Sequence, residues 1–195
     1  VVLGSNNSAH DICADLWEND ADVTMVQRTS TLIARSETLF LGSSYSEDSL
    51  EAGLSMEQVD MIAATTPYGL MHISERQSSK AMQKQDADFY KRLTEAGFLI
   101  DFGDDASGLY MKYVRRGSGY YIDVGASDLI IQGEIKLRSS VSVARITADG
   151  VILTDGSELP ADLIVCATGY GSMNGWAGRL ISQDVADKVG QCWGL

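Results

Sequence analysis

The sequence predicts an α/β fold, and three observations support this class. An apolar run at residues 1–3 leads through a glycine into a segment whose apolar residues recur at the spacing of an amphipathic helix. Residues 22–27 form a short β-rich run typical of a buried parallel strand. Polar and apolar residues alternate at the start of residues 141–156, and two Asp-Gly pairs mark turns in this stretch, which indicates a β-meander. We therefore expect a parallel sheet with flanking helices, a β-meander and an irregular helical insertion.

The opening unit is expected to be β-α-β. The apolar period of the first helix starts at Ala9, with Ser8 as its N-cap. Asp11 would place negative charge in the first turn, where the helix dipole favours it, and Asn19-Asp20 ends the helix. The run at residues 22–27 then supplies the second strand.

Residues 38–130 are interpreted as a partly helical insertion. Positions 38–80 show no clean period and predict helical pieces joined by loops. Residues 80–96 regain a helical period, and Gly97 is the expected C-cap. From residue 98 onward the chain is expected to be β-rich, with short strands or turns at 120–124 and 135–137 and a buried apolar strand at 162–166.

Composition limits the classes of protein to consider. The 195 residues suit one domain or one and a half. With 45% hydrophobic and 22% charged residues, the chain is not disordered, collagenous or a coiled coil. No apolar run approaches the roughly 18 residues of a membrane helix, so a soluble protein without a membrane partner is expected. The net charge of -12 would repel nucleic acid, which is not expected as a partner.

The cysteine and histidine residues indicate neither a disulfide framework nor a metal site. The odd number of widely spaced cysteines, Cys13, Cys166 and Cys192, fits reduced, buried thiols and a cytoplasmic location better than disulfides or a metal site. Only two histidines occur, so no metal centre rich in histidine is expected. His10 is expected on the exposed surface of the first helix.

Two charged clusters also receive structural interpretations. Residues 101–105 contain Asp-Phe-Gly without other kinase signatures, and a solvated acidic turn is expected there. Arg115-Arg116 is too small a basic pair to imply nucleic-acid binding.

A glycine-led loop at the first strand-to-helix turn carries the strongest chemical signal. The six residues Gly4, Ser5, Asn6, Asn7, Ser8 and Ala9 stand in the register of the dinucleotide fingerprint G-x-G-x-x-G/A. Gly4 permits the tight turn and Ala9 permits close packing of helix on strand. Asn6 departs from the second glycine, but asparagine reaches the left-handed conformation more readily than most residues. Such a turn offers free backbone N–H groups to a phosphate, or it binds nothing and only connects two elements.

The end of the second strand indicates which dinucleotide is preferred. An NAD site places Asp or Glu there for the ribose 2′-hydroxyl, whereas this chain has Gln27-Arg28-Thr29-Ser30. The Arg28 guanidinium could pair with the 2′-phosphate of NADP, and Thr29 and Ser30 could add hydroxyl donors. An arginine simply solvated at a strand end is the alternative.

Two stretches resemble the flavin-containing monooxygenase superfamily. In that family the NADP fingerprint commonly reads G-x-G-N-S-G/A-x-D, which Gly4, Asn7, Ser8, Ala9 and Asp11 match. The second stretch is residues 155–170, Asp-Gly-Ser-Glu-Leu-Pro-Ala-Asp-Leu-Ile-Val-Cys-Ala-Thr-Gly-Tyr, which ends in the Ala-Thr-Gly-Tyr crossover. Related flavoprotein reductases also carry Ala-Thr-Gly there.

The resemblance implies a Rossmann-like NADP-binding domain of a larger flavoprotein. Residues 1–195 would form this domain, and residues 160–195 would return towards a flavin domain that lies outside the chain. Thr168, Gly169 and Tyr170 would then lie near FAD.

The implied reaction is flavin-dependent monooxygenation. NADPH reduces FAD, and the peroxyflavin oxygenates a small-molecule substrate. The cofactors carry this chemistry, so no catalytic side chain and no metal is expected. A flavoprotein NAD(P)H reductase and a free-standing NADP-binding module without catalysis are the alternatives.

Overall fold

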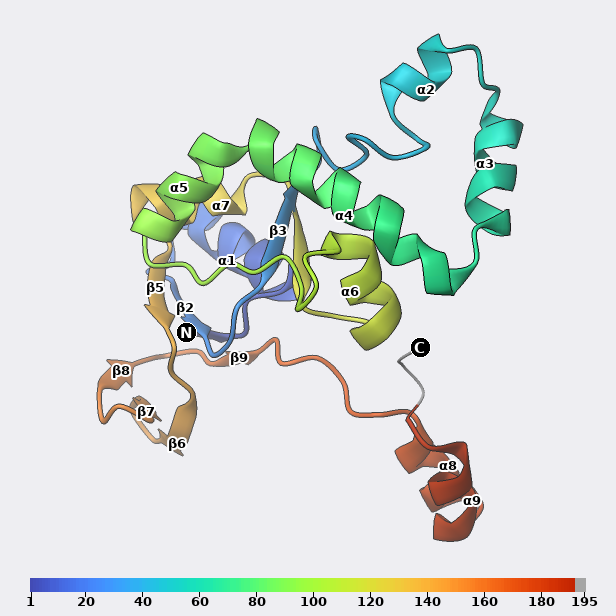
Figure 1. Ribbon diagram of the computed structural model, residues 1–195. Coiled ribbons are helices and arrows are strands. Elements are labelled where there is room, and N and C mark those ends of the chain that lie inside the picture. The colour runs from blue at the N-terminus through green and yellow to red at the C-terminus, as the bar shows by residue number, and fades with distance from the viewer. Residues whose placement is uncertain (192–195) are drawn as a thin grey trace.

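The computed structural model describes residues 1–191, whose strands form three sheets (Figure 1). A four-stranded parallel sheet has the order β5-β2-β1-β9, formed by β1 (Val2–Leu3), β2 (Thr24–Gln27), β5 (Lys136–Ser139) and β9 (Val165–Cys166). A parallel pair joins β3 (Leu32–Arg35) and β4 (Tyr120–Asp123). The antiparallel sheet consists of β6 (Val143–Thr147), β7 (Gly150–Leu153) and β8 (Glu158–Pro160).

Helices pack around the two parallel sheets and extend beyond them. Those nearest the sheets are α1 (Asn7–Glu18), α5 (Ala87–Glu95), α6 (Gly108–Arg116) and α7 (Ala126–Gln132). Those that extend outward are α2 (Glu47–Glu51), α3 (Met56–Thr65), α4 (Tyr68–Gln85), α8 (Asn174–Leu180) and α9 (Gln183–Val189). No helix of residues 1–191 combines the length and apolar composition that crossing a bilayer requires.

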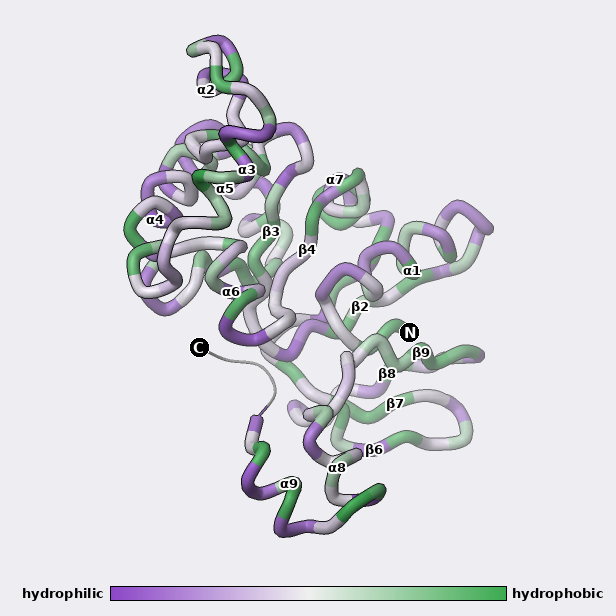
Figure 2. Tube along the Cα trace, turned by 90° about the vertical axis from the view of Figure 1, so that its right-hand side faces the viewer, coloured by the Kyte–Doolittle hydropathy of each residue, from purple (hydrophilic) through white to green (hydrophobic). Residues whose placement is uncertain are grey.

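The main core lies where α1, α5 and α7 meet the sheets. Val2, Met25 and Ile33 from the strands are fully buried there, together with Cys13 of α1 and Leu93 of α5. In Figure 2, β3 is largely hydrophobic, whereas α1 and α4 carry long hydrophilic stretches. The predicted α/β class, a parallel sheet with flanking helices and antiparallel strands, is confirmed.

The start of the first helix was predicted two residues too late. Helix α1 begins at Asn7, so Asn6 is the N-cap residue and Ser8 lies exposed inside the helix. The Asn6 side chain forms no capping hydrogen bond, and no acidic residue occupies the first turn, so Asp11 lies beyond it. The predicted end was correct, because Asn19 is the C-cap and Asp20 has a positive φ of 61°.

The predicted helix over residues 80–96 is two helices, α4 and α5, that meet at Asp86. The Asp86 carboxylate is buried, accepts a hydrogen bond from the Thr38 hydroxyl and lies 3.5 Å from the Arg35 guanidinium. These partners from the β3 end hold the break. The C-cap residue of α5 is Ala96, and Gly97, with φ 91°, follows it, so the predicted C-cap lies one residue too late.

Two helices also lie after residue 98, where the sequence indicated a mainly β-rich chain. Helix α6 follows the acidic residues 101–105, and α7 lies between β4 and β5. Both are short, and both end in a left-handed glycine, Gly117 and Gly133. Their few residues give less than three turns of apolar period, and the neighbouring glycines favoured a β interpretation.

Two burial predictions were also wrong. Strand β9 is shorter than the predicted run, and Leu163 and Cys166 are exposed, so only Cys13 of the described cysteines is a buried thiol. Cys192 lies outside the described residues. His10 is fully buried, with its ring 3.9 Å from that of Tyr121 and almost parallel to it.

The Gln27 side chain ties the end of β2 to the loop after α5. Its carboxamide donates to the Leu99 carbonyl at 2.9 Å and accepts from the Leu99 N–H at 2.8 Å. The Gln27 side chain thus forms with Leu99 the pair of hydrogen bonds that a neighbouring strand would form. Thr31, four residues further along the chain, forms a parallel bridge to Ile100. This junction places the loop of residues 98–105 beside the carboxyl end of the main sheet.

Candidate dinucleotide-binding site

A cavity of about 640 Å³ lies at the carboxyl ends of three strands of the main sheet. Its lining includes residues 4–6 after β1, residues 28–30 after β2, and residues 167–168 after β9. The chain leaves β1 towards β2 on one side, while β9 lies on the other side of β1, so the strand order reverses here. Open α/β sheets bind ligands at such a reversal, and the volume suits a small-molecule site.

Gly4 permits the close approach of two strand ends at this reversal. It has a φ of 133°, and a Cβ at this position would lie 2.3 Å from the carbonyl oxygen of Ala167. Any larger residue would therefore collide with the chain leaving β9. The glycine predicted to allow a tight turn also allows β1 and β9 to end side by side.

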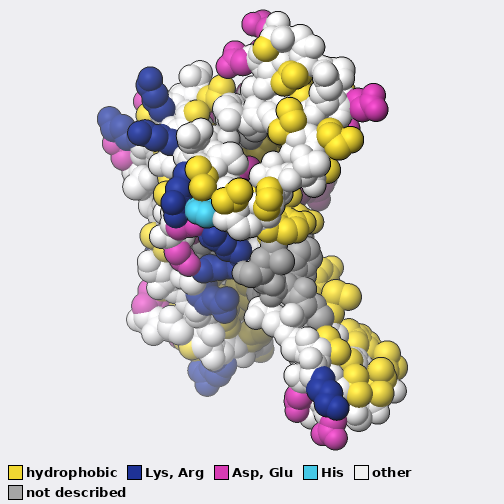
Figure 3. All heavy atoms as spheres, turned by 45° about the vertical axis from the view of Figure 1, so that its right-hand side comes forward, with side chains coloured by type: hydrophobic (Ala, Val, Ile, Leu, Met, Phe, Trp, Pro, Cys, Tyr) yellow, Lys and Arg dark blue, Asp and Glu magenta, His cyan; other side chains and the backbone are white. Residues whose placement is uncertain are grey.

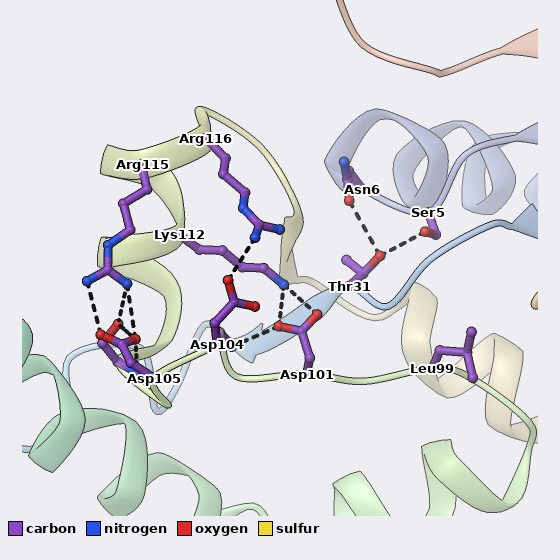
Figure 4. A network of polar contacts seen from close by, with 12 residues as sticks. Ser5, Asn6, Thr31, Leu99, Asp101, Asp104, Asp105, Lys112, Arg115 and Arg116 are labelled. Atoms are coloured by element: carbon purple, nitrogen blue, oxygen red, sulfur yellow. Dashed lines mark hydrogen bonds and ion pairs between the residues drawn. The ribbon is translucent and has the colours of Figure 1, made fainter. Parts of the chain in front are cut away.

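Asn6 occupies the second fingerprint position in an extended conformation. Its φ of -99° and ψ of -168° differ from the left-handed conformation that the sequence suggested for it. The Thr31 hydroxyl lies 2.8 Å from the Ser5 hydroxyl and 3.4 Å from Asn6 Oδ1 (Figure 4). The loop thus keeps an ordinary backbone at Asn6, and a side chain from the start of β3 holds it.

The second half of the fingerprint turns away from the cavity. Asn7 Oδ1 accepts a hydrogen bond from the Ile122 N–H at 3.0 Å, which joins α1 to β4. Ser8 is exposed and Ala9 is fully buried in the core. Of the predicted loop residues, Gly4, Ser5 and Asn6 line the cavity, whereas Asn7, Ser8 and Ala9 do not.

The other predicted site residues also divide into two groups. Arg28, Thr29 and Ser30 line the cavity together, with Arg28 exposed. Thr168 lines it as well, on the side of β9. Gly169 and Tyr170 do not, and the Tyr170 side chain extends fully into solvent.

Helix α6 brings two cations to the cavity that the sequence did not place there. Lys112 is almost fully buried, and its Nζ lies 2.5 and 2.6 Å from the two Asp101 carboxylate oxygens. Arg116 lies 3.0 Å from Asp104, and both residues are more exposed (Figure 4). Asp101 and Asp104 line the cavity as well, so two of its three cationic side chains are ion-paired, and Arg28 is the one that forms no ion pair among the described residues.

The Asp101 carboxylate stays ionised beside Lys112. Burial alone would raise its pKa, but hydrogen bonds from Lys112, Ser30 and the Gly103 N–H outweigh burial and lower the pKa below its usual value. The ion pair therefore fixes the Lys112 side chain at the cavity and links it to Ser30.

The three aspartates of residues 101–105 are thus ion-paired, and only Asp104 is as solvated as the sequence suggested. Asp105 forms an ion pair with Arg115 at 3.0 Å, and Asp104 forms one with Arg116. The two arginines of α6 therefore neutralise two acids of this loop. The basic pair was visible in the sequence. Its place at the cavity was not, because the helix that presents it was not predicted.

No protein-family model matches the sequence. Over 193 residues, 97% of its length, the chain is 27% identical to indole-3-pyruvate monooxygenase YUCCA1 of Oryza sativa subsp. japonica, and it spans 41% of that protein. Its fold is similar to that of cyclohexanone monooxygenase bound to epsilon-caprolactone, with a TM-score of 0.52, 14% identity, and coverage of 89% of this chain and 40% of the other. The resemblance to the flavin-containing monooxygenase superfamily is confirmed.

Proposed function

We propose that this chain, which resembles the flavin-containing monooxygenase superfamily over nearly its whole length, is the NADP(H)-binding part of a flavin-dependent monooxygenase. Its cofactors are NADP and FAD, and the parent protein uses them to oxygenate a small-molecule substrate. The single observation that carries the proposal is the cavity at the strand reversal, which brings the glycine-led loop together with Arg28, a cation that forms no ion pair among the described residues.

The cavity suits a dinucleotide carrying an extra phosphate. Gly4 lets the loop approach closely, and Ser5 and Asn6 lie at the start of α1, where helix N–H groups favour an anion. Arg28 stands at the end of β2, where an NAD site would carry an acid that repels a 2′-phosphate. Lys112 and Arg116 also line the cavity, each ion-paired with an aspartate of the same lining.

The residues of this chain would bind and orient NADPH, and the reduced nicotinamide supplies the hydride when bound. We infer that a flavin domain in the parent protein receives FAD, since the chain spans 41% of the length of the monooxygenase it resembles. Residues 160–195 would lead towards that domain, with Thr168, Gly169 and Tyr170 near the flavin.

The proposal is tested by the dinucleotide preference of the Arg28→Ala variant. Loss of a charge-assisted contact with the 2′-phosphate should weaken NADPH binding by about 1.5 to 3 kcal/mol, and NADH binding much less. Isothermal titration calorimetry with each dinucleotide measures both affinities. Arg145→Ala removes an exposed arginine of the meander and should change neither. Equal weakening of NADPH and NADH by Arg28→Ala would contradict the assignment.

A further inference from the structure

The segment from residue 36 to residue 75 combines acidic charge with exposed apolar side chains. It contains seven Asp and Glu residues and no Lys or Arg. Nine of its large hydrophobic side chains are exposed by more than a third: Phe40, Tyr45, Leu50, Met56, Met61, Ile62, Tyr68, Leu70 and Ile73. We call this region, which covers α2, α3 and the first turns of α4, the acidic apolar surface.

This surface is made of formed helices that stand away from the main sheet (Figure 1). Helix α3 begins with a capping box, in which the Ser55 hydroxyl accepts from the Gln58 N–H and the Gln58 side chain accepts from the Ser55 N–H. Of the residues in α3, Val59 is buried, whereas Met56, Met61 and Ile62 are exposed. The helix therefore has an apolar face that the described residues leave uncovered.

The acids of this surface have few cationic neighbours. Among the described residues, the ion pairs of this segment are limited to the exposed contact of Glu37 with Arg35, at 3.6 Å. Asp60 accepts a hydrogen bond from Tyr45 at 3.0 Å. In Figure 3, hydrophobic and acidic side chains gather over the upper part of the visible face, and Lys and Arg side chains lie to its left and below.

Charge decides which partner fits. A second copy of the chain would set seven acids against seven acids, and an anionic membrane would be repelled in the same way. A positively charged partner gains both Coulomb attraction and apolar burial. The flexible side chains of Met56 and Met61 suit the packing of a helix against this face.

We propose that the acidic apolar surface is a docking site for a basic amphipathic helix of another polypeptide. Leucine-type side chains of that helix pack on α3 and the start of α4, and its Lys or Arg side chains face Glu51 and Glu57. This site shares no residue with the cavity proposed to bind the dinucleotide, so an experiment can refute either proposal without refuting the other.

The test uses a fluorescein-labelled peptide of about 20 residues, with Leu at helical spacing and Lys elsewhere, and measures binding by fluorescence anisotropy. Binding should weaken as salt is raised from about 50 to 300 mM, and the same peptide with Glu in place of Lys should not bind. Equal binding of the Lys and Glu peptides would overturn the proposal, as would failure of the Lys peptide to bind.

Two pairs of variants locate the site. Met61→Gln with Ile62→Gln should weaken binding by about tenfold, because two apolar contacts are lost. Leu180→Gln with Ile181→Gln, at the more exposed C-terminal end of α8, should not. Glu57→Lys and Asp184→Lys both change an exposed acid in the first turn of a serine-capped helix, and only Glu57→Lys should weaken binding.

Equal effects within either pair would show that the peptide binds the acidic protein without a site, and the proposal would be wrong. Circular dichroism checks that each variant keeps its helices. NADPH binding should be the same in all four variants, which separates this proposal from the function of the cavity.

Discussion

His10 shows how burial sets the chemistry of a single side chain. The ring lies between Tyr121, at 3.9 Å, and Phe98, at 5.6 Å. Its Nδ1–H donates to the Asn6 carbonyl at 3.1 Å, and Nε2 is buried with no partner among the described residues. Burial lowers the pKa of His10 to about 4, although the Asn6 bond opposes this shift. The histidine next to the glycine-led loop is therefore neutral at pH 7, and its role is structural.

This shift predicts a loss of stability in mild acid. The unfolded chain protonates His10 near pH 6.5 and the folded chain only near pH 4, so unfolding takes up a proton between these values. The free energy of unfolding should fall by about 1.4 kcal/mol for each pH unit below 6.5 through this residue. Urea denaturation at several pH values, compared with a His10→Phe variant, measures the contribution.

His72→Gln is the matched control, because this partly exposed histidine of α4 lies outside the main core. The His10→Phe variant should have a flatter profile than the wild type, and His72→Gln should keep the wild-type slope. If the His10→Phe and wild-type profiles are parallel, His10 is protonated equally in both states and the assignment is wrong.

At this scale the sequence predicted the residues whose role depends on local chain geometry. Gly4 at the turn and Arg28 after the strand both lie at the cavity, as expected from their position next to strand ends. The burial of His10 could not be predicted, because it depends on Tyr121 and Phe98, about 90 residues or more further along the chain. Lys112 was missed for the same reason, since its partner and its cavity are formed by tertiary contacts.

At the scale of elements, the turn between β1 and α1 depends on the absence of a side chain at residue 4. Gly4→Ala should reduce the free energy of unfolding by about 3 kcal/mol more than Gly125→Ala. Both glycines have a positive φ, 133° and 123°, but only at Gly4 would the new Cβ meet a backbone oxygen, 2.3 Å away. Chemical denaturation gives the free energy of unfolding of each variant. The difference between the two variants reports the steric collision, because both share the backbone strain of a positive φ. Equal losses would show that Ala167 moves aside without cost.

The break between α4 and α5 gives a second prediction for an element. Asp86→Ala removes a buried hydrogen-bond acceptor from Thr38 and the ion pair with Arg35, and should cost about 1 to 3 kcal/mol of stability. Asp88→Ala, at an exposed position paired with Arg92 within α5, should cost much less. Thermal unfolding followed by circular dichroism compares them. A larger loss for Asp88→Ala would rule out Asp86 as the residue that holds the junction.

Elements with a full period or a clear turn were predictable, and short ones were not. The β-α-β start and the meander each combine an apolar pattern with turn residues, and both are present. Helices α6 and α7 have nine and seven residues, too few for the period to stand out among glycines. The break at Asp86 depends on Thr38 and Arg35, which no local pattern connects to residues 80–96.

At the scale of the whole molecule, the cavity is assembled from segments distant in sequence. Residues 4–6, 28–30, 101–119, 141–143 and 167–168 all contribute to its lining. The sequence could predict the three segments that carry the fingerprint, the strand-end arginine and the Ala-Thr-Gly-Tyr crossover with Thr168, because each contains its own motif. The others reach the cavity only through the way the sheets and α6 pack.

We expect the 195-residue chain, purified alone, to be colourless and unable to oxidise NADPH with oxygen. One glycine-led fingerprint loop receives one dinucleotide pyrophosphate, and FAD needs a strand-turn-helix of its own. An absorbance spectrum after incubation with FAD and desalting, followed by an NADPH oxidation assay, measures both properties. Stoichiometric retained flavin, or turnover of NADPH that depends on FAD, would show that the segment is more complete than proposed.

The pairing of β1 with β9 also constrains how the chain is made. Val2 is the register partner of Val165, so one edge of the first strand stays open until residues more than 160 positions later leave the ribosome. At about 5 to 20 residues per second, this edge waits roughly ten to thirty seconds during synthesis. An open apolar strand edge invites pairing with other chains. The strand that precedes the glycine-led loop therefore keeps one unpaired edge during most of the synthesis of this chain.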